Sequence, residues 1–504
     1  MKKKIFLMCL ILSSLISAQI KYPFKSFREY KAKLDSVCNI PDETKRAYAV
    51  VEFFDTLAAN KNIPFTFKDT VALTYRGNAT SVVWAGDFNG WSPTTGNFSG
   101  AKVGLSNVWL CVKSFPITAR LDYKIVVNGS WITDPENPNR QYSGVGTYNS
   151  ELRMPGWAYP KETLYNDKVP AGNLSDNFSV DSKQLGYKVY YKVYTPNGYD
   201  KLSKLPTIYV TDGHEYSDER LGSMIHVLNN LIHEKKIKPV IAVFIDPRSS
   251  PSGGTNRRGS EYTINKKFAD FAADELVPKI DIDFRTEKSA DSRAILGTSL
   301  GGLNSAYFGV YRSDVFRLIG IHSPAFQANK QIYDLYTNAA KLPLKIFMST
   351  GTIYDTQSNA LQMKSIFDSK GYEYNYIEVP EGHSWGNWRA LLDEPLIYFF
   401  KNDNSTGYKT EKEIPLAFEL KQNYPNPFNP ETTIKYSLTK PSNISLKVYD
   451  LLGNEVAALV DKYQQAGTHS ASLNALSFSL SSGVFFCALR ADNFISSKKM
   501  LLIK

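Results

Sequence analysis

Residues Ala294 to Leu303 read A-I-L-G-T-S-L-G-G-L, a pattern that determines how the centre of the chain is expected to fold. The apolar run at 294–296 predicts a short buried strand, and residues 304–311 predict a helix. Between them stands a G-x-S-x-G motif with Ser299 at its centre. So tight a turn needs glycine on both sides of the serine, and it exposes the serine Oγ above the end of a sheet. Ser299 is therefore the candidate nucleophile.

Strand-like and helix-like segments alternate on both sides of this motif, from about residue 175 to residue 402. The expected strands are 189–194, 207–211, 240–246, 294–297, 318–322 and 345–349, followed by a strand-like run at 374–379. The expected helices are 220–233, 268–277, 303–311 and 361–369. Such alternation predicts a mostly parallel sheet with helices on both faces.

A serine hydroxyl is a weak nucleophile until a base takes its proton, so a histidine is required. Of the six histidines in the chain, His383 lies on a late loop, which suits the chain order Ser, Asp, His. The orienting acid should follow a strand between the two, as Asp355 does; Asp368, within a helical run, is the alternative. His322 directly follows a strand and is expected to be structural and close to the site.

An oxyanion hole requires two backbone N–H groups aimed at the developing negative charge. Leu300, the residue after the candidate nucleophile, is expected to supply one, and His214, in the loop after the strand at 207–211, the other. Trp385 and Trp388 are expected to line the acyl pocket. No closely spaced set of metal ligands occurs, so neither a metal nor another cofactor is expected.

Several motifs between residues 185 and 400 together carry a family resemblance. They are T-D-G-H-E at 211–215, V-F-I-D-P-R at 243–248, R-G-S-E-Y at 258–262, the stretch at 294–303, S-D-V-F at 313–316 and E-G-H-S-W-G-N-W at 381–388. This region resembles the esterase D and enterochelin-esterase-like family of α/β-hydrolases, which includes feruloyl and acetylxylan esterases. The resemblance implies a carboxylic-ester hydrolase with Ser299, Asp355 and His383 as its triad.

The chain before this region divides into two expected parts. Residues 19–70 form a lead-in in which 31–60 is expected to be helical, and 71–155 form a small β-sandwich with strands at 71–75, 81–84, 108–112 and 122–127. A-G-D-F-N-G-W-S-P at 85–93 and the segment 123–137 resemble the glycogen-binding-like E-set module, family 48 of carbohydrate-binding modules. Exposed indole faces stack on sugars, which makes Trp91 and Trp131 candidate carbohydrate contacts. The alternative is that the tryptophans fill the sandwich core and the module only packs on the hydrolase.

After the hydrolase-like part, taken as 156–402, a polar linker is expected at 403–414 and an all-β domain at 415–504. Q-N-Y-P-N-P-F-N-P-E-T-T-I-K-Y-S-L at 422–438 and V-Y-D-L-L-G at 448–453 resemble the type IX secretion sorting domain. The resemblance implies export by that machinery through the outer membrane, with release or attachment at the cell surface; a fibronectin-like spacer is the alternative. The expected fold class is thus an α/β-hydrolase domain flanked by two all-β, immunoglobulin-like sandwiches.

The first eighteen residues have the form of a signal peptide, expected to be removed. Three lysines at 2–4 precede an apolar run at 5–16, and Ser17-Ala18 offer small residues for cleavage. No other stretch reaches 18 apolar residues, so no transmembrane segment is expected after removal.

Composition excludes several other classes of protein. Of 504 residues 43% are hydrophobic and 21% charged, which is typical of a soluble globular protein. The net charge of +10 includes the three signal lysines and forms no dense basic block, so a nucleic-acid partner is not expected. The four cysteines form no C-x-x-C pair, which argues against a zinc ribbon or a thioredoxin-type site, and disulfides are not expected to hold the protein together.

Three hypotheses about function follow. The first is a secreted serine esterase acting on acyl or feruloyl esters of polysaccharide, with a siderophore trilactone esterase as a close variant. The second is a non-catalytic carbohydrate-binding surface protein. The third is an adhesion protein that uses the hydrolase fold as a scaffold.

Overall fold

The computed structural model describes residues 24–402, 418–439, 442–464, 467–491 and 494–503. The chain divides into two compact units at the boundary between residues 402 and 403, and each unit is described here by itself. The signal segment expected at 1–18 and the linker expected at 403–414 lie outside the described residues.

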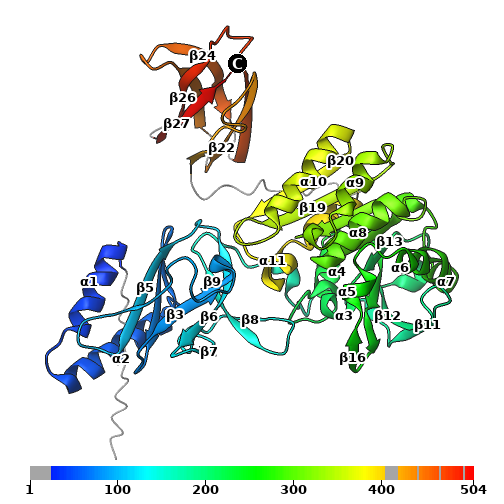
Figure 1. Ribbon diagram of the computed structural model, residues 1–504, viewed down its shortest axis with the longest axis horizontal. Coiled ribbons are helices and arrows are strands. Elements are labelled where there is room, and N and C mark those ends of the chain that lie inside the picture. The colour runs from blue at the N-terminus through cyan, green and yellow to red at the C-terminus, as the bar shows by residue number, and fades with distance from the viewer. Residues whose placement is uncertain (1–23, 403–417, 440–441, 465–466, 492–493, 504) are drawn as a thin grey trace, which may run out of the picture. The chain divides into compact units, whose positions relative to one another are not determined.

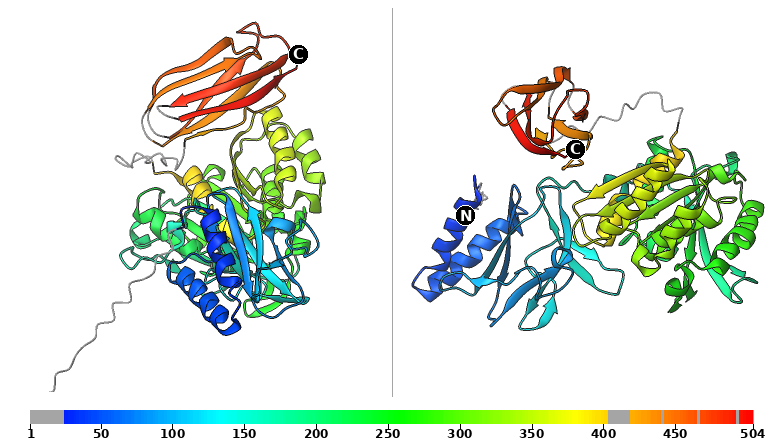
Figure 2. Two further views of the ribbon diagram at one scale, coloured as in Figure 1. Left: turned by 90° about the vertical axis from the view of Figure 1, so that its left-hand side faces the viewer. Right: turned by 45° about the horizontal axis from the view of Figure 1, so that its top comes forward.

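The first unit begins with two helices, α1 (Phe27–Cys38) and α2 (Glu43–Ala59). The stretch 31–60, expected to be helical, is thus helical apart from a break at residues 39–42. Pro41 disfavours helical geometry at the residue before it, and the Asp42 side chain caps the second helix by accepting the Lys45 N–H at 2.8 Å. Both helices pack their apolar faces against one sheet of the domain that follows. Figures 1 and 2 draw the two helices in blue beside that domain.

That domain contains two antiparallel sheets, which fits the expected sandwich. The first has the order β1-β2-β5-β4 and the second the order β3-β6-β9-β8, with β7 added to β6. The strands are β1 (Phe65–Phe67), β2 (Thr70–Arg76), β3 (Val82–Gly86), β4 (Ala101–Lys102), β5 (Val108–Ser114), β6 (Arg120–Val127), β7 (Ser130–Ile132), β8 (Arg140–Tyr142) and β9 (Tyr148–Arg153). Trp84 and Trp109 are buried in the core, whereas Trp131 on β7 is 45% exposed.

A nine-stranded sheet forms the centre of the α/β domain, with the order β10-β12-β14-β13-β17-β18-β19-β20 and β11 paired to β12. The strands are β10 (Asn173–Leu174), β11 (Phe178–Asp181), β12 (Lys188–Thr195), β13 (Thr207–Val210), β14 (Ile241–Asp246), β17 (Arg293–Thr298), β18 (Leu318–His322), β19 (Lys345–Gly351) and β20 (Glu373–Val379). From β14 to β20 every neighbouring pair is parallel. All seven expected strands are confirmed.

Helices cover both faces of this sheet. Along β13, Tyr209 enters one hydrophobic cluster while Ile208 and Val210 enter the other, the alternation that a strand buried on both faces requires. The helices are α3 (Gly213–Tyr216), α4 (Met224–His233), α5 (Arg258–Glu261), α6 (Lys266–Asp270), α7 (Val277–Asp283), α8 (Leu300–Tyr311), α9 (Gln331–Asn338), α10 (Gln357–Lys370), α11 (Trp385–Ala390) and α12 (Asp393–Phe400). A small hairpin, β15 (Arg248–Ser250) with β16 (Gly253–Asn256), precedes α5. The helix expected over 268–277 instead contains a π-helical turn at Phe271–Leu276.

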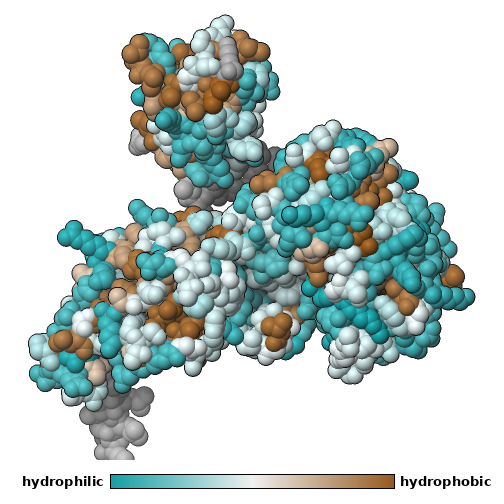
Figure 3. Space-filling view, viewed as in Figure 1, coloured by the Kyte–Doolittle hydropathy of each residue, from teal (hydrophilic) through white to brown (hydrophobic). Residues whose placement is uncertain are grey.

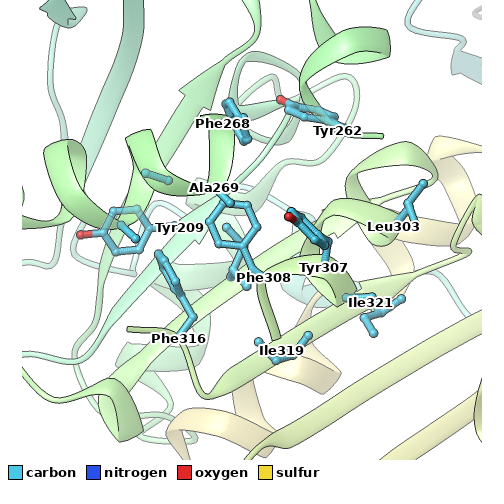
Figure 4. Close-up of a cluster of buried hydrophobic side chains, with 14 of the residues drawn as sticks. Tyr209, Tyr262, Phe268, Ala269, Leu303, Tyr307, Phe308, Phe316, Ile319 and Ile321 are labelled. Atoms are coloured by element: carbon cyan, nitrogen blue, oxygen red, sulfur yellow. The ribbon is translucent and has the colours of Figure 1, made fainter. Parts of the chain in front are cut away.

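The larger of the two clusters anchors the helix that follows Ser299. Figure 4 shows Tyr307 and Phe308 of α8 among side chains from the sheet and from α6. Phe308 meets Phe316 edge to face, with ring centroids 5.2 Å apart. This packing holds α8 rigidly on β17 and β18, which gives the strand–turn–helix junction a fixed base.

The second unit is an antiparallel β-domain with sheets of order β21-β22-β25 and β24-β23-β26-β27. Its strands are β21 (Glu419–Leu420), β22 (Glu431–Leu438), β23 (Ser442–Tyr449), β24 (Glu455–Gln464), β25 (Gly467–Asn474), β26 (Gly483–Ala491) and β27 (Phe494–Leu502). One hydrophobic cluster lies between the two sheets.

Three further features concern the described residues. No helix among them is long and apolar enough to cross a membrane. Their cysteines, Cys38, Cys111 and Cys487, are buried and free. On the face drawn in Figure 3, hydrophobic residues form small separate patches among hydrophilic ones.

Candidate active site

Ser299 stands at the sharp turn between β17 and α8, as the G-x-S-x-G motif predicts. Its backbone has φ 59° and ψ −117°, a conformation that a non-glycine residue keeps only when its surroundings enforce it. The Ser299 N–H donates to the His322 carbonyl at 3.0 Å, and the Ser299 carbonyl accepts the Ala325 N–H at 2.9 Å. A Cβ at Gly297 would collide with the Gly301 carbonyl, so the turn closes only with glycine there.

Ser299, His383 and Asp355 form a continuous hydrogen-bonded series. Ser299 Oγ lies 3.0 Å from His383 Nε2, and His383 Nδ1 lies 2.6 Å from Asp355 Oδ1. The three side chains follow β17, β20 and β19, whose parallel arrangement places their carboxyl ends at one edge of the sheet. The His383 side chain is 35% exposed, so solvent and small substrates reach it, whereas the Asp355 side chain is fully buried.

The Asp355 carboxylate is held by several donors besides His383. Its Oδ2 accepts the Ser323 hydroxyl and the Gly351 N–H, both at 2.6 Å. Burial opposes its charge, but the bonds from His383, Ser323 and Gly351 outweigh burial and lower the pKa of Asp355 below its usual value. An ionised, immobile carboxylate in this position keeps the imidazole in one orientation and favours a proton on Nδ1.

Two other residues considered from the sequence are not members of this series. The alternative acid Asp368 is on α10, where it pairs with Lys364 at 2.8 Å. His322 is fully buried at the end of β18 and shares a 2.7 Å hydrogen bond with Ser349. Burial lowers the pKa of His322 to about 3, so this ring stays neutral and acts as a structural neighbour of Ser299.

The two residues expected at the oxyanion hole lie at neighbouring strand ends. Leu300 opens α8, and N–H groups in a first helical turn have no partner within the helix. His214 is in the short helix α3, which follows β13, and β13 pairs with β17. Thr211, just before α3, has its hydroxyl so close to Gly301 that a Cβ there would lie 2.7 Å away. The loop before α3 thus lies directly against the turn that carries Ser299.

The two tryptophans Trp385 and Trp388, on α11, are buried beside His383. The Trp388 ring meets the His383 ring edge to face, with centroids 4.9 Å apart, and Trp385 meets both Trp388 and Tyr216 in the same manner. Both indoles therefore support the loop from within, and their role as walls of an acyl pocket stays a prediction. Trp91 lies in the sandwich, where its Nε1 donates to Asp87 at 3.1 Å.

Sequence reasoning missed the groups that support the three side chains. Ser323 follows β18 as Asp355 follows β19. Its position after a strand could therefore have predicted that it lies at the carboxyl edge of the sheet. Asn387 donates to the Gly382 carbonyl at 2.9 Å and so braces the His383 loop, residues 380–384 between β20 and α11. Asn387 does not follow a strand, so the same signal could not have found it. Among the described residues, no group of three or more His, Cys, Asp or Glu side chains could hold a metal ion.

Buried carboxyl groups line the contact between the His383 loop and the sandwich. Burial raises the pKa of Glu381 to about 7, although Arg120 and a bond from Trp157 oppose the shift. Burial and the nearby Asp122 raise the pKa of Asp87 to about 8. Both groups are thus held partly or wholly as neutral acids near neutral pH.

These shifts predict that the first unit loses stability as the pH rises. A carboxyl group whose folded pKa lies above its unfolded value stabilises the fold at low pH, and this contribution is lost as pH rises through the folded pKa, here about 7 for Glu381. Glu381→Gln cannot ionise and should reduce the fall in unfolding free energy between pH 5 and 8 by roughly 1–3 kcal/mol. Denaturant unfolding followed by tryptophan fluorescence measures this selectively, because all seven tryptophans lie in the first unit.

Glu378→Gln is the matched control, because Glu378 is exposed on β20 and should leave the pH dependence as in the wild type. An unchanged slope in Glu381→Gln would show that Glu381 does not hold its proton in the folded state.

Two regions of the chain match the models of known families. Residues 182–399 match the family described as putative esterase, and residues 422–504 match the secretion system C-terminal sorting domain. The endo-1,4-beta-xylanase/feruloyl esterase of Xylanibacter ruminicola is 26% identical over 298 residues, which cover 55% of this chain and 38% of that protein. The uncharacterised protein YjcH of Bacillus subtilis is 26% identical over 228 residues, 43% of this chain and 92% of that protein.

Among solved structures, an enterobactin esterase from Shigella flexneri matches with a TM-score of 0.53 at 19% identity. The match covers 65% of this chain and 92% of that one, a larger share of this chain than residues 182–399. The shared fold therefore extends beyond the esterase-matched region.

Proposed function

We propose that this chain, a carboxylic-ester hydrolase with its esterase domain at residues 182–399 and a secretion sorting domain at 422–504, is an exported serine esterase. The hydrogen-bonded series of Ser299, His383 and Asp355 carries the proposal. It has the distances that proton transfer from a serine hydroxyl needs, 3.0 Å to the imidazole and 2.6 Å from the imidazole to the acid.

In the first half of the reaction, Ser299 Oγ attacks the ester carbonyl carbon while His383 Nε2 takes the hydroxyl proton. The carbonyl oxygen becomes an oxyanion, to which the N–H groups of Leu300 and His214 donate. The carbon–oxygen bond to the alcohol then breaks, and the imidazolium gives its proton to the leaving alkoxide. The product is an acyl-Ser299 ester and the free alcohol.

The second half repeats these steps with water as the nucleophile. His383 takes a proton from the water, the hydroxide attacks the acyl carbon, and Ser299 Oγ leaves with the proton from the imidazolium. Throughout, the Asp355 carboxylate stays ionised and offsets the charge on the ring, which agrees with its lowered pKa. The acid is released and Ser299 is free for the next cycle.

The proposed substrate is an acyl or feruloyl ester attached to polysaccharide. A sorting domain implies work outside the cell, where such polymers occur, and one sequence relative is named as a xylanase and feruloyl esterase. This chain spans 38% of that relative, so its substrate does not transfer directly. A siderophore trilactone is the second candidate, since the fold shared with an enterobactin esterase extends beyond the esterase-matched region.

The deciding experiment compares wild type with Ser299→Ala on four esters: p-nitrophenyl acetate, methyl ferulate, feruloylated xylan and a catecholate trilactone. Turnover of the two ferulates by the wild type alone supports the proposal, and preference for the trilactone favours the second candidate. If wild type and variant are equally inert on all four, the chain is a non-catalytic binding protein and the proposal is wrong.

Carbohydrate binding by the sandwich is a separate part of the proposal, and Trp131 is the residue to test. The residue is 45% exposed on β7, so we expect its ring to be accessible for stacking on a sugar. Trp131→Ala should weaken retention on insoluble xylan or starch roughly three- to tenfold, which corresponds to ~0.7–1.4 kcal/mol of stacking. Pull-down isotherms measure the change.

Tyr424→Ala, which removes an exposed aromatic ring from the other unit, is the control and should bind as the wild type does. Equal retention of Trp131→Ala and wild type would remove Trp131 from the proposed sugar site. Trp91→Ala is a less clean test, because Trp91 also donates to the buried Asp87.

A further inference from the structure

Arg120, at the start of β6, connects the sandwich to the loop that carries His383. The side chain is fully buried, and it pairs with Asp122 and Glu151 of the sandwich. Its Nη1 also donates to the Ser384 hydroxyl at 3.1 Å and lies 3.9 Å from the Glu381 carboxylate. One guanidinium therefore binds two groups in its own domain and the residues on either side of His383 in the other.

The His383 loop and the start of α11 pack closely against the sandwich. Arg120 and Glu381 form a parallel β-bridge, so the two backbones run side by side. A Cβ at Gly386 would overlap the Arg120 guanidinium, and a Cβ at Gly382 would overlap the Asp87 side chain. Glycine at these two positions is what allows the loop to lie on the sandwich.

The loop that carries Asp355 rests on the same domain. Ile353 packs against the hydrophobic cluster of the sandwich, and its N–H donates to the Glu381 carbonyl at 3.2 Å. The Tyr354 ring lies over Gly90, where a Cβ would be 3.1 Å from it. Both loops beside Ser299 that supply the base and the acid are thus supported from outside the α/β domain.

Loops are the least rigid parts of a fold, whereas strands in a packed sheet are well fixed. A shift of about 1 Å in a reacting group costs about 100-fold in rate. The stiffness of the His383 loop therefore matters for proton transfer, and the Arg120 guanidinium attaches this loop to the sandwich through Ser384 and Glu381.

We propose that Arg120 is a positioning residue for His383, so that the sandwich forms part of the catalytic apparatus. The inference rests on the proposed function, since it requires His383 to act as the base for Ser299. Arg120 touches no substrate; it acts by holding Glu381 and Ser384, and through them the imidazole between them.

Arg120→Lys tests the proposal with the charge retained. Lysine keeps a cation among the buried carboxylates but lacks the planar fork, so it cannot hold Asp122, Glu151 and Ser384 together. The kcat for p-nitrophenyl acetate should fall about 10- to 100-fold, because the base is displaced. The KM should change less than about twofold, because the substrate contacts are intact.

Arg293→Lys is the matched control. Arg293 is also buried and paired, with Asp281 at 2.9 Å, but it begins β17, at the opposite end of the strand from Ser299. Its substitution should destabilise the fold comparably and keep kcat within about twofold of wild type. Tryptophan fluorescence and active-site titration with a fluorophosphonate normalise every rate to folded enzyme.

Ser384→Ala gives a second, milder test that removes only the acceptor of the Arg120 bond. It should lower kcat about three- to tenfold at unchanged KM, and it decides the matter if Arg120→Lys does not fold. The inference is overturned if folded Arg120→Lys and Ser384→Ala both keep kcat within twofold of wild type, or if Arg293→Lys loses as much kcat as Arg120→Lys. Full activity of Ser299→Ala would instead overturn the proposed function itself.

Discussion

Ser299→Ala is expected to lower kcat by about 10⁴- to 10⁶-fold on every ester that the wild type hydrolyses. The methyl group cannot attack a carbonyl, and only the oxyanion-binding N–H groups and substrate binding remain to favour the reaction. The fold should be unaffected, because the substitution removes one oxygen and leaves the backbone bonds of Ser299 to His322 and Ala325 in place. Initial rates measured at high enzyme concentration, and corrected for background hydrolysis, are sensitive enough for this range.

Two further measurements make the result specific to Ser299. A fluorophosphonate should label the wild type once, on the peptide that contains Ser299, and should leave Ser299→Ala unlabelled; Ser260→Ala, an exposed serine on α5, should label normally. His383→Ala should lose nearly as much kcat as Ser299→Ala, and the double variant little more, because the two residues act as a unit. Labelling of another serine, or independent losses that multiply, would contradict the proposed relay.

Asp355→Asn should lower kcat by about 10³- to 10⁴-fold with little change in KM. The amide is nearly the same size as the carboxylate, but it carries no charge to stabilise the imidazolium. It also has to present its NH₂ to one of the donors that now point at the carboxylate, namely Ser323, the Gly351 N–H or the His383 ring. The His383 ring then adopts the wrong tautomer or leaves its position.

The control for this prediction is Asp368→Asn. Asp368 is the other acid that the sequence offered, and it pairs with Lys364 on α10, so the variant should keep kcat within about twofold of wild type. A full rate in Asp355→Asn combined with a loss in Asp368→Asn would reverse the assignment. Loss in neither variant would mean that His383 works without an orienting acid.

Much of the fold was predictable because local patterns and global packing agree. The alternation of apolar strands and helices predicted the parallel sheet, since a strand buried on both faces leaves a continuous apolar run such as residues 241–245 of β14. The break at 39–42 in the stretch expected to be helical has a local cause, the proline at position 41 and the capping aspartate after it. The π-helical turn at Phe271–Leu276 has no comparable sequence signal.

The candidate site was predictable to the same extent as the strands that carry it. Ser299, Asp355 and His383 each follow a strand, and parallel strands deliver their carboxyl ends to one edge. Ser323 could have been found by the same rule. Arg120 could not, because no sequence pattern near it predicts a contact with a residue more than 250 positions later.

By itself, the sequence determined the strand–turn–helix around Ser299, the chain order of the candidate acid and base, and the sorting domain, because each rests on residues close together in the chain. Only the tertiary structure decided what the sandwich does for the rest of the first unit. Its G-D-F-N-G-W segment suggested a sugar site, yet Asp87 packs on Gly382 and Arg120 binds beside His383. Contacts of this kind depend on how two separately folded surfaces meet, and the buried guanidinium here has acidic side chains of both domains around it.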